Sequence, residues 1–97
     1  MRGRFAPSPT GQLHLGNLRT ALVSWLHARS LAGEWLVRME DLDRVTSSTS
    51  IAADQLRSLA ALGMLPDGAV VNQSERFDRY RTAIATLQAN GRVYECF

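Results

Sequence analysis

The sequence predicts an α/β fold in which helices pack on a parallel sheet. Short strand-like segments alternate along the chain with longer segments of helical periodicity, and a glycine follows each helical segment. Strands that alternate with helices of this length are typical of parallel sheets with right-handed crossovers. A chain of 97 residues has room for one small domain, so we expect no internal boundary between residues 1 and 97.

Three segments carry apolar residues at the i, i+3, i+4, i+7 spacing of a helix that buries one face. They cover residues 18–26, 52–60 and 77–87, and they are followed by Gly33, Gly63 and Gly91 as stop signals. Before the third segment, Ser74 is a good N-cap residue and Glu75 suits the first turn of a helix. We therefore predict that Ser74 caps the third helix.

Four short segments between the helices have strand character. They are Gly3–Ala6, Trp35–Met39, Ala69–Asn72 and Val93–Phe97. A doubly wound nucleotide-binding domain normally has more strands than four. We therefore expect this chain to be the leading part of a larger catalytic domain.

Composition excludes several classes of function. A net charge of +2 is too small to indicate nucleic-acid binding by itself. All 11 basic residues are Arg, so a catalytic lysine would have to come from elsewhere. One cysteine allows no internal disulfide, which fits a reducing cytosol, and the longest apolar run is too short to span a bilayer. We expect a cytoplasmic protein with no membrane contact.

The segment Arg4–Asn17 is the first to suggest chemistry. It follows the first strand and opens the first helix, and ligands of open parallel sheets bind at the carboxyl ends of strands. Its two prolines stiffen the loop, and Gly16 permits close backbone approach. His14 precedes a helix N-terminus, where free amides and the helix dipole favour phosphate. The segment is neither a P-loop nor a dinucleotide fingerprint, and a lone His-x-Gly is a weak signal.

A second segment places three carboxylates, Glu40, Asp41 and Asp43, at the end of the second strand candidate. From spacing alone they fit a Mg²⁺ site, an amine-binding site or a solvated turn, and the turn is the favoured interpretation. A third segment, Gln73–Arg76, is explained by helix capping and receives no catalytic role.

Taken together, these strings resemble the class I glutamyl-tRNA synthetases. Pro-Ser-Pro-Thr-Gly-x-Leu-His-x-Gly-Asn is similar to the first signature of that family, and His14–Asn17 matches its His-x-Gly-x motif. Arg-x-Glu-Asp-x-Asp and Gln-Ser-Glu-Arg resemble later blocks, so the resemblance covers nearly the whole chain. It implies a partial Rossmann-like sheet and a ligase that activates L-glutamate with ATP and Mg²⁺ and transfers it to tRNA.

The resemblance also implies roles for individual residues. Those implied in catalysis are His14, Gly16 and Asn17, and those implied in ATP binding are Thr10, His14, Gly16 and Asn17. Those implied in glutamate binding are Arg4, Phe5, Ala6, Pro7, Ser8 and Glu40. Within this set, we expect Arg4 to hold the side-chain carboxylate and Glu40 to hold the α-ammonium group.

The short connection before Gln73 resembles that of the glutamyl-queuosine tRNA(Asp) synthetases, which attach glutamate to the queuosine base of tRNA(Asp). Two alternatives stay open: an amino-terminal fragment of a synthetase that charges tRNA(Glu), and a non-catalytic truncated paralogue that self-associates through its unfinished sheet. Pro66 departs from the usual Trp-Asp pair of the family, which puts the geometry of this loop in doubt.

Two parts of the family machinery depend on sequence beyond residue 97. In the queuosine paralogues a Tyr-x-Cys-x-Cys segment supplies the first Zn²⁺ ligands, and only Cys96 matches it here. A lone cysteine is more often a small buried residue, so the zinc prediction is conditional on further ligands. The Lys-Met-Ser-Lys-Ser-like loop that stabilises pyrophosphate is also missing, and we expect weak or no full aminoacylation by this chain alone.

Overall fold

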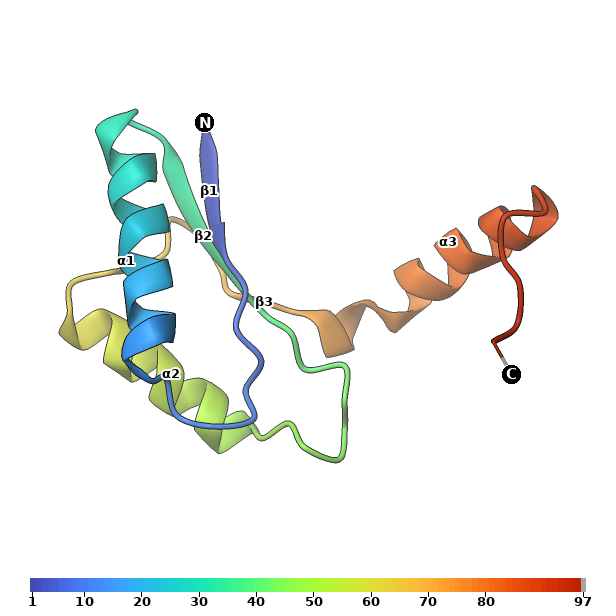
Figure 1. The fold of residues 1–97 in the computed structure, drawn as a ribbon, viewed down its shortest axis with the longest axis horizontal. Coiled ribbons are helices and arrows are strands. Elements are labelled where there is room, and N and C mark those ends of the chain that lie inside the picture. Colours follow the sequence, from blue (N-terminus) through green and yellow to red (C-terminus); the bar gives the residue numbers. More distant parts are fainter. Residues whose placement is uncertain (97) are drawn as a thin grey trace.

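The computed structural model describes residues 1–96, and its sheet has three parallel strands among them. The strands are β1 (Arg2–Phe5), β2 (Glu34–Met39) and β3 (Val71–Asn72), with β2 in the centre (Figure 1). Arg2 pairs with Glu34 in the β1–β2 ladder, and Arg38 pairs with Val71 in the β2–β3 ladder. The predicted parallel α/β architecture is therefore confirmed.

The three predicted helices are present. They are α1 (Leu15–Ser30), α2 (Thr49–Ala61) and α3 (Phe77–Ala89), and a 3₁₀ turn, η1 (Gln73–Arg76), precedes α3. Gly63 and Gly91 end their helices with φ values of 77° and 64°, as glycine stop signals do. After α1 the left-handed residue is Ala32, with φ 50°, one position before the predicted stop at Gly33.

The core lies between one face of the sheet and the helices α1 and α2. Trp35, Val37 and Met39 alternate along β2 and point to this face, which is the period-2 pattern of a strand with one buried side. Ala21 and Ala28 of α1 pack against them. A Cβ atom at Gly3 would lie only 3.0 Å from that of Ala28, so small residues let α1 lie close to β1.

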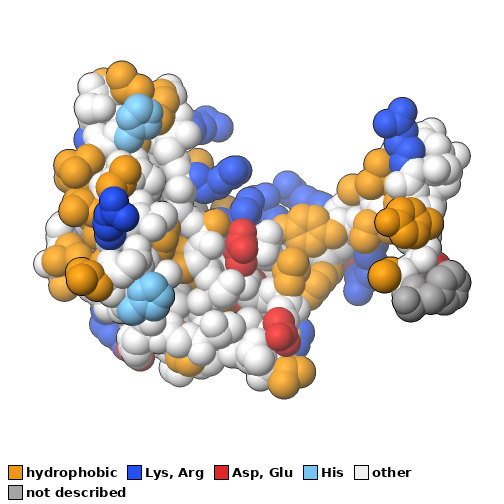
Figure 2. Space-filling model, viewed as in Figure 1, with side chains coloured by type: hydrophobic (Ala, Val, Ile, Leu, Met, Phe, Trp, Pro, Cys, Tyr) orange, Lys and Arg blue, Asp and Glu red, His pale blue; other side chains and the backbone are white. Residues whose placement is uncertain are grey.

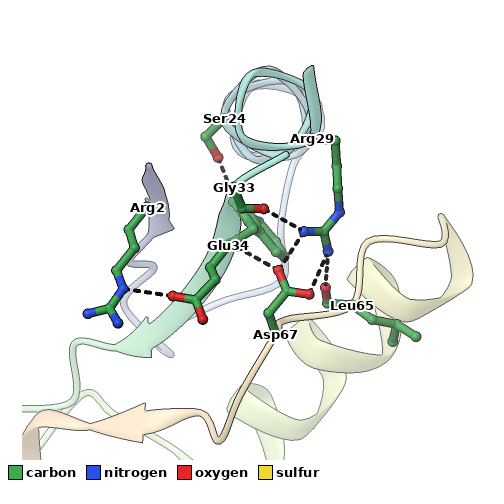
Figure 3. A network of polar contacts seen from close by, with 8 residues as sticks. Arg2, Ser24, Arg29, Gly33, Glu34, Leu65 and Asp67 are labelled. Atoms are coloured by element: carbon green, nitrogen blue, oxygen red, sulfur yellow. Dashed lines mark hydrogen bonds and ion pairs between the residues drawn. The ribbon is translucent and has the colours of Figure 1, made fainter. Parts of the chain in front are cut away.

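A polar network ties α1 and β2 to the connection between α2 and β3 (Figure 3). The Asp67 carboxylate accepts hydrogen bonds from the Trp35 backbone N–H at 2.7 Å and from both terminal nitrogens of Arg29. The hydrogen bonds from Arg29 and from the Trp35 amide lower the pKa of Asp67. The Trp35 indole donates to Ser24 at 2.8 Å. The connection that contains Pro66 is thus anchored to β2 and α1 through Asp67, the residue after Pro66.

The predicted fourth strand over Val93–Phe97 is wrong for residues 93–96, which form no strand; Phe97 lies outside the described residues. The third helix, α3, extends away from the sheet and buries none of its residues (Figure 1). After α3 the chain turns at the far end of the helix, and residues 93–96 lie there, distant from the sheet, where none of its strands offers them hydrogen bonds (Figure 1).

The predicted capping of α3 by Ser74 is also wrong. Ser74 lies in η1, and Arg76 precedes α3 without a capping hydrogen bond from its side chain. Ser74 instead donates from its backbone N and its Oγ to Asp41, at 2.8 and 2.6 Å. Ser74 therefore binds a residue that follows β2 in place of capping the helix that follows it in the sequence.

Apolar side chains are exposed over two helices. They gather on the outer surface of α1, and more are exposed on α3 (Figure 2). Across residues 1–96, no helix combines the length and the apolar character needed to cross a membrane.

Candidate active site

The loop between β1 and α1 encloses one side of a cavity of about 630 Å³. Most of the residues predicted to bind glutamate or ATP line it: Arg4, Phe5, Ala6, Pro7, Ser8, Thr10, His14 and Asn17. Gly16 and Glu40 do not. A cavity of this size is within the usual range for small-molecule sites. The fold thus brings the first signature together at the carboxyl end of β1.

His14 has a structural task at the start of α1. Its Nδ1 accepts hydrogen bonds from the backbone N–H groups of Gly16 and Asn17, at 3.0 and 3.3 Å. In return, the Asn17 side-chain oxygen accepts from the His14 backbone N–H at 3.2 Å. An Nδ1 that accepts two hydrogen bonds carries no proton, so the ring proton is on Nε2. The capping arrangement therefore makes Nε2 the hydrogen-bond donor of this side chain.

This geometry corrects one expectation about the helix N-terminus. Two of the amides that were expected to attract phosphate, those of Gly16 and Asn17, are already bonded to His14. Toward an anion there remain the helix dipole, the backbone N–H of Leu15, the His14 Nε2–H donor and the Asn17 Nδ2 group. A Cβ atom at Gly16 would lie 2.9 Å from the His14 ring, so glycine is needed there for the ring itself.

The proline-rich loop is held by its carbonyl groups. The Pro7 carbonyl accepts from the Glu40 backbone N–H at 2.9 Å, and the Pro9 carbonyl accepts from that of Ser48 at 3.0 Å. The carbonyls of Ser8 and Gly11 accept from the side chain of Gln55, at 3.0 and 2.8 Å. Prolines donate no backbone hydrogen bond, so the loop depends on donors from the end of β2 and from α2.

Arg4 and Phe5 leave β1 in opposite directions. Arg4 is exposed, lines the cavity and makes no ion pair with any residue in 1–96. An Arg fork without a carboxylate partner suits a dicarboxylic ligand. The Phe5 ring is buried in the core, where it stacks on Trp35 with 6.3 Å between the ring centroids.

The three carboxylates at the end of β2 have three different partners. Glu40 pairs with Arg38 at 2.9 Å and is joined to the cavity loop through its backbone, while Asp41 binds Ser74. Asp43 accepts from Val45 and Thr46 in a turn, and these hydrogen bonds lower its pKa. Among the described residues, no three His, Cys, Asp or Glu side chains form a group that could hold a metal ion. The solvated-turn interpretation therefore fits Asp43, and the Mg²⁺ interpretation has no support.

Gly11, which the sequence indicated for tight turns and close backbone approach to a ligand, also lines the cavity. Sequence reasoning missed four further residues that line it: Gln12, Leu13, Thr20 and Gln55. Gln55 had a detectable signal, because it interrupts the apolar face of its helix between Ala52 and Leu59. Cys96 is exposed, so its interpretation as a small buried residue is wrong.

The family model for class I tRNA synthetases (E and Q), catalytic domain, matches residues 1–97. The chain belongs to this family. It is 57% identical over 95 residues to a Glutamyl-Q tRNA(Asp) synthetase of Chromobacterium violaceum, covering 98% of this chain and 32% of that protein. It is 46% identical over 97 residues to a Glutamate--tRNA ligase of Verminephrobacter eiseniae, covering all of this chain and 20% of that one.

A solved structure supports the fold. The crystal structure of a glutamate tRNA ligase from Elizabethkingia meningosepticum, in complex with its amino acid, superposes with a TM-score of 0.79 at 39% identity. The match covers 89% of this chain and 19% of that one, and it agrees with a partial Rossmann-like sheet. The chain thus spans about a third of the length of the Chromobacterium relative, and less of the two glutamate tRNA ligases.

Proposed function

We propose that this chain forms the amino-terminal part of a ligase that activates L-glutamate with ATP and transfers it to the queuosine base of tRNA(Asp). One observation carries the proposal: a single cavity joins Arg4, which has no ion-pair partner among residues 1–96, to the His14 cap of α1. A fork for a carboxylate and a donor for phosphate are the two chemistries that glutamate adenylation needs.

In the proposed reaction, an α-carboxylate oxygen of glutamate attacks the α-phosphorus of ATP. The bond between the α-phosphorus and the bridging oxygen to the β-phosphate breaks, and pyrophosphate leaves with the electron pair. Negative charge grows on the phosphoryl oxygens, where the Nε2–H of His14 donates most strongly in the transition state. Arg4 holds the substrate side chain. Glu40, which here pairs with Arg38 outside the cavity, holds the ammonium group once its carboxylate leaves Arg38 and turns toward the substrate, so that positioning supplies much of the rate.

Mg²⁺ and Zn²⁺ differ in what they would require of this chain. Mg²⁺ enters with ATP as part of the substrate complex, and residues 1–96 hold no group of three His, Cys, Asp or Glu side chains that could bind it independently. Zn²⁺ would require about four ligands, and Cys96 is the one cysteine of the sequence. The described residues therefore do not fit a zinc site.

The choice of acceptor rests on similarity. The Chromobacterium Glutamyl-Q tRNA(Asp) synthetase is 57% identical to this chain and the Verminephrobacter Glutamate--tRNA ligase 46%, which favours queuosine over charging of tRNA(Glu). Transfer assays with radiolabelled glutamate on tRNA(Asp), with and without queuosine, and on tRNA(Glu) test this choice. Labelling of tRNA(Glu) alone would contradict it.

The test of the site starts with binding, because the isolated chain is expected to aminoacylate weakly. ATP with Mg²⁺ should shift the amide NMR signals of Thr10, Gly16 and Asn17, and glutamate-dependent ATP–pyrophosphate exchange then measures activation. His14→Asn is the informative variant, since Asn still caps a helix but lacks the Nε2 donor. We expect exchange to fall by about 10²–10³-fold, as for other lost transition-state donors.

Two further variants complete this test. Glu40→Gln should weaken glutamate binding more than ATP binding. His27→Ala is the matched control, because His27 is exposed near the other end of α1 and does not line the cavity. Exchange that survives both His14→Asn and Glu40→Gln would refute the site. ATP binding without any exchange would instead favour either an inactive amino-terminal fragment or the non-catalytic paralogue, and self-association, measured by sedimentation at increasing concentration, would point to the paralogue.

A further inference from the structure

Gln55 is a polar side chain buried in the apolar face of α2. It is 1% exposed, and it lies three residues after Ala52 and four before Leu59, where the helical pattern calls for an apolar residue. Its Nε2 donates to the carbonyls of Ser8 and Gly11. Because both partners are acceptors, the orientation of the amide is determined, and Oε1 is the atom that faces away from them.

The Oε1 atom of Gln55 is buried and has no hydrogen-bond partner within residues 1–96. An unpaired buried acceptor destabilises a fold, and an apolar side chain of the same size would remove the penalty. The unpaired acceptor thus offsets at least part of the stability that the two hydrogen bonds to the loop contribute. What glutamine supplies is a pair of donors from one buried amide group.

Those two donors bind carbonyl groups of a loop that has few backbone N–H groups of its own to form internal hydrogen bonds. Pro7 and Pro9 offer no backbone N–H, so turn hydrogen bonds within the loop are limited. The other outside donors to its carbonyls are backbone amides, those of Glu40 and Ser48. Gln55 is the side chain that reaches the centre of the loop, on both sides of Pro9 and Thr10.

We propose that Gln55 is a positioning residue: it fixes the carbonyls of Ser8 and Gly11 and so holds residues 7–14 in the shape that binds the ligand. The role of Gln55 in fixing the loop is inferred from its two hydrogen bonds alone. The identity of the ligand, ATP with glutamate, rests on the proposed function. A loop that is in its binding shape for only a fraction of the time loses affinity by that fraction.

Gln55→Met tests the proposal, because methionine keeps the length of the side chain and removes both donors and the unpaired acceptor. We expect a melting temperature close to that of the original chain, because removal of the unpaired acceptor offsets the two lost hydrogen bonds. We also expect the ¹⁵N order parameters of Thr10, Gly11 and Gln12 to fall from about 0.85 toward 0.6 in the absence of any ligand. A residue with a purely structural role would give the reverse: a lower melting temperature and an unchanged loop.

The affinity for Mg²⁺-ATP, measured by calorimetry, should fall about tenfold in Gln55→Met, which corresponds to a loop in its binding shape for about a tenth of the time. Gln88→Met is the matched control, since Gln88 is an exposed glutamine on α3. Should Gln55→Met fail to fold, Gln55→Leu gives the same measurements.

The outcomes separate this proposal from the proposed function. If the original chain binds no Mg²⁺-ATP, the proposed function fails while the order parameters still decide whether Gln55 holds the loop. Unchanged order parameters in Gln55→Met would overturn the proposal. A mobile loop with undiminished ATP affinity would also overturn it, because positioning would then serve no ligand.

Discussion

The chain has two regions that obey the same sequence rules with different results. In the body, residues 1–76, strands and helices share a core built around Trp35, and each segment gains its stability from distant neighbours. In the arm, residues 77–96, a helix of comparable periodicity buries nothing. Apolar spacing thus predicts which face of a helix can be buried. Whether that face is buried depends on whether the helix lies against the sheet.

The largest expected effect is in the body. Trp35→Ala removes a fully buried indole and its hydrogen bond to Ser24, and loss of such a side chain costs about 3–5 kcal/mol. Leu59→Ala, at about 2–5 kcal/mol, keeps the effect measurable if the first variant does not fold. Urea unfolding followed by circular dichroism gives both values. A loss below about 1 kcal/mol in both variants would show that the body is not the stable unit.

A second prediction concerns the loss of stability at acid pH, which should depend on a carboxylate of the body and not on one of the arm. The pKa of Asp67 is lowered by Arg29 and the Trp35 amide, so its contribution to stability is present above the unfolded pKa, about 4, and is lost as pH falls through the folded pKa. Asp67→Asn should flatten this acid limb of the unfolding midpoint, measured by tryptophan fluorescence. Asp78→Asn in the arm is the control and should leave the limb in place.

These two regions also show how much the sequence could predict. The three helices and the parallel sheet were predictable because their patterns are local and repeat over many residues. The strand expected at Val93–Phe97 was not, because β-propensity describes a segment that already has a neighbour to pair with. The prediction that Ser74 caps α3 was wrong for a related reason. The Ser74 hydroxyl donates its hydrogen bond to Asp41, 33 residues away, and not to the backbone of the nearby helix.

The sequence predicted which residues lie in the candidate site better than it predicted what each of them contacts. The cavity gathers Arg4, Ser8, Thr10 and His14 as the signature indicated. That His14 would occupy two helix amides itself depends on ring orientation, which no spacing rule supplies. Gln55 was visible only as a break in an apolar pattern, and its two acceptors lie more than 40 residues away.

A third prediction returns to the arm. Ile84 is 49% exposed, and Ile84→Ala should change the stability of the body by no more than about 0.5 kcal/mol, since exposed substitutions rarely do more. Urea unfolding of the variant beside the original chain measures this. A larger loss that grows with protein concentration would mean that the arm is covered by a second copy, which would revive the predicted self-association.

The smallest effect expected is within the arm itself. Arg81 pairs with Asp78 one turn earlier on α3, and the two side chains are 74% and 98% exposed. Such a pair stabilises a helix by about 0.3–0.5 kcal/mol and is screened by salt. Arg81→Ala should therefore lower the helical signal at 222 nm slightly, and 1 M NaCl should reduce the difference to the part due to the Arg81 guanidinium over the Phe77 ring. Tryptophan fluorescence should not change, because both tryptophans lie in the body; a shift there would show that the arm and the body fold as one unit.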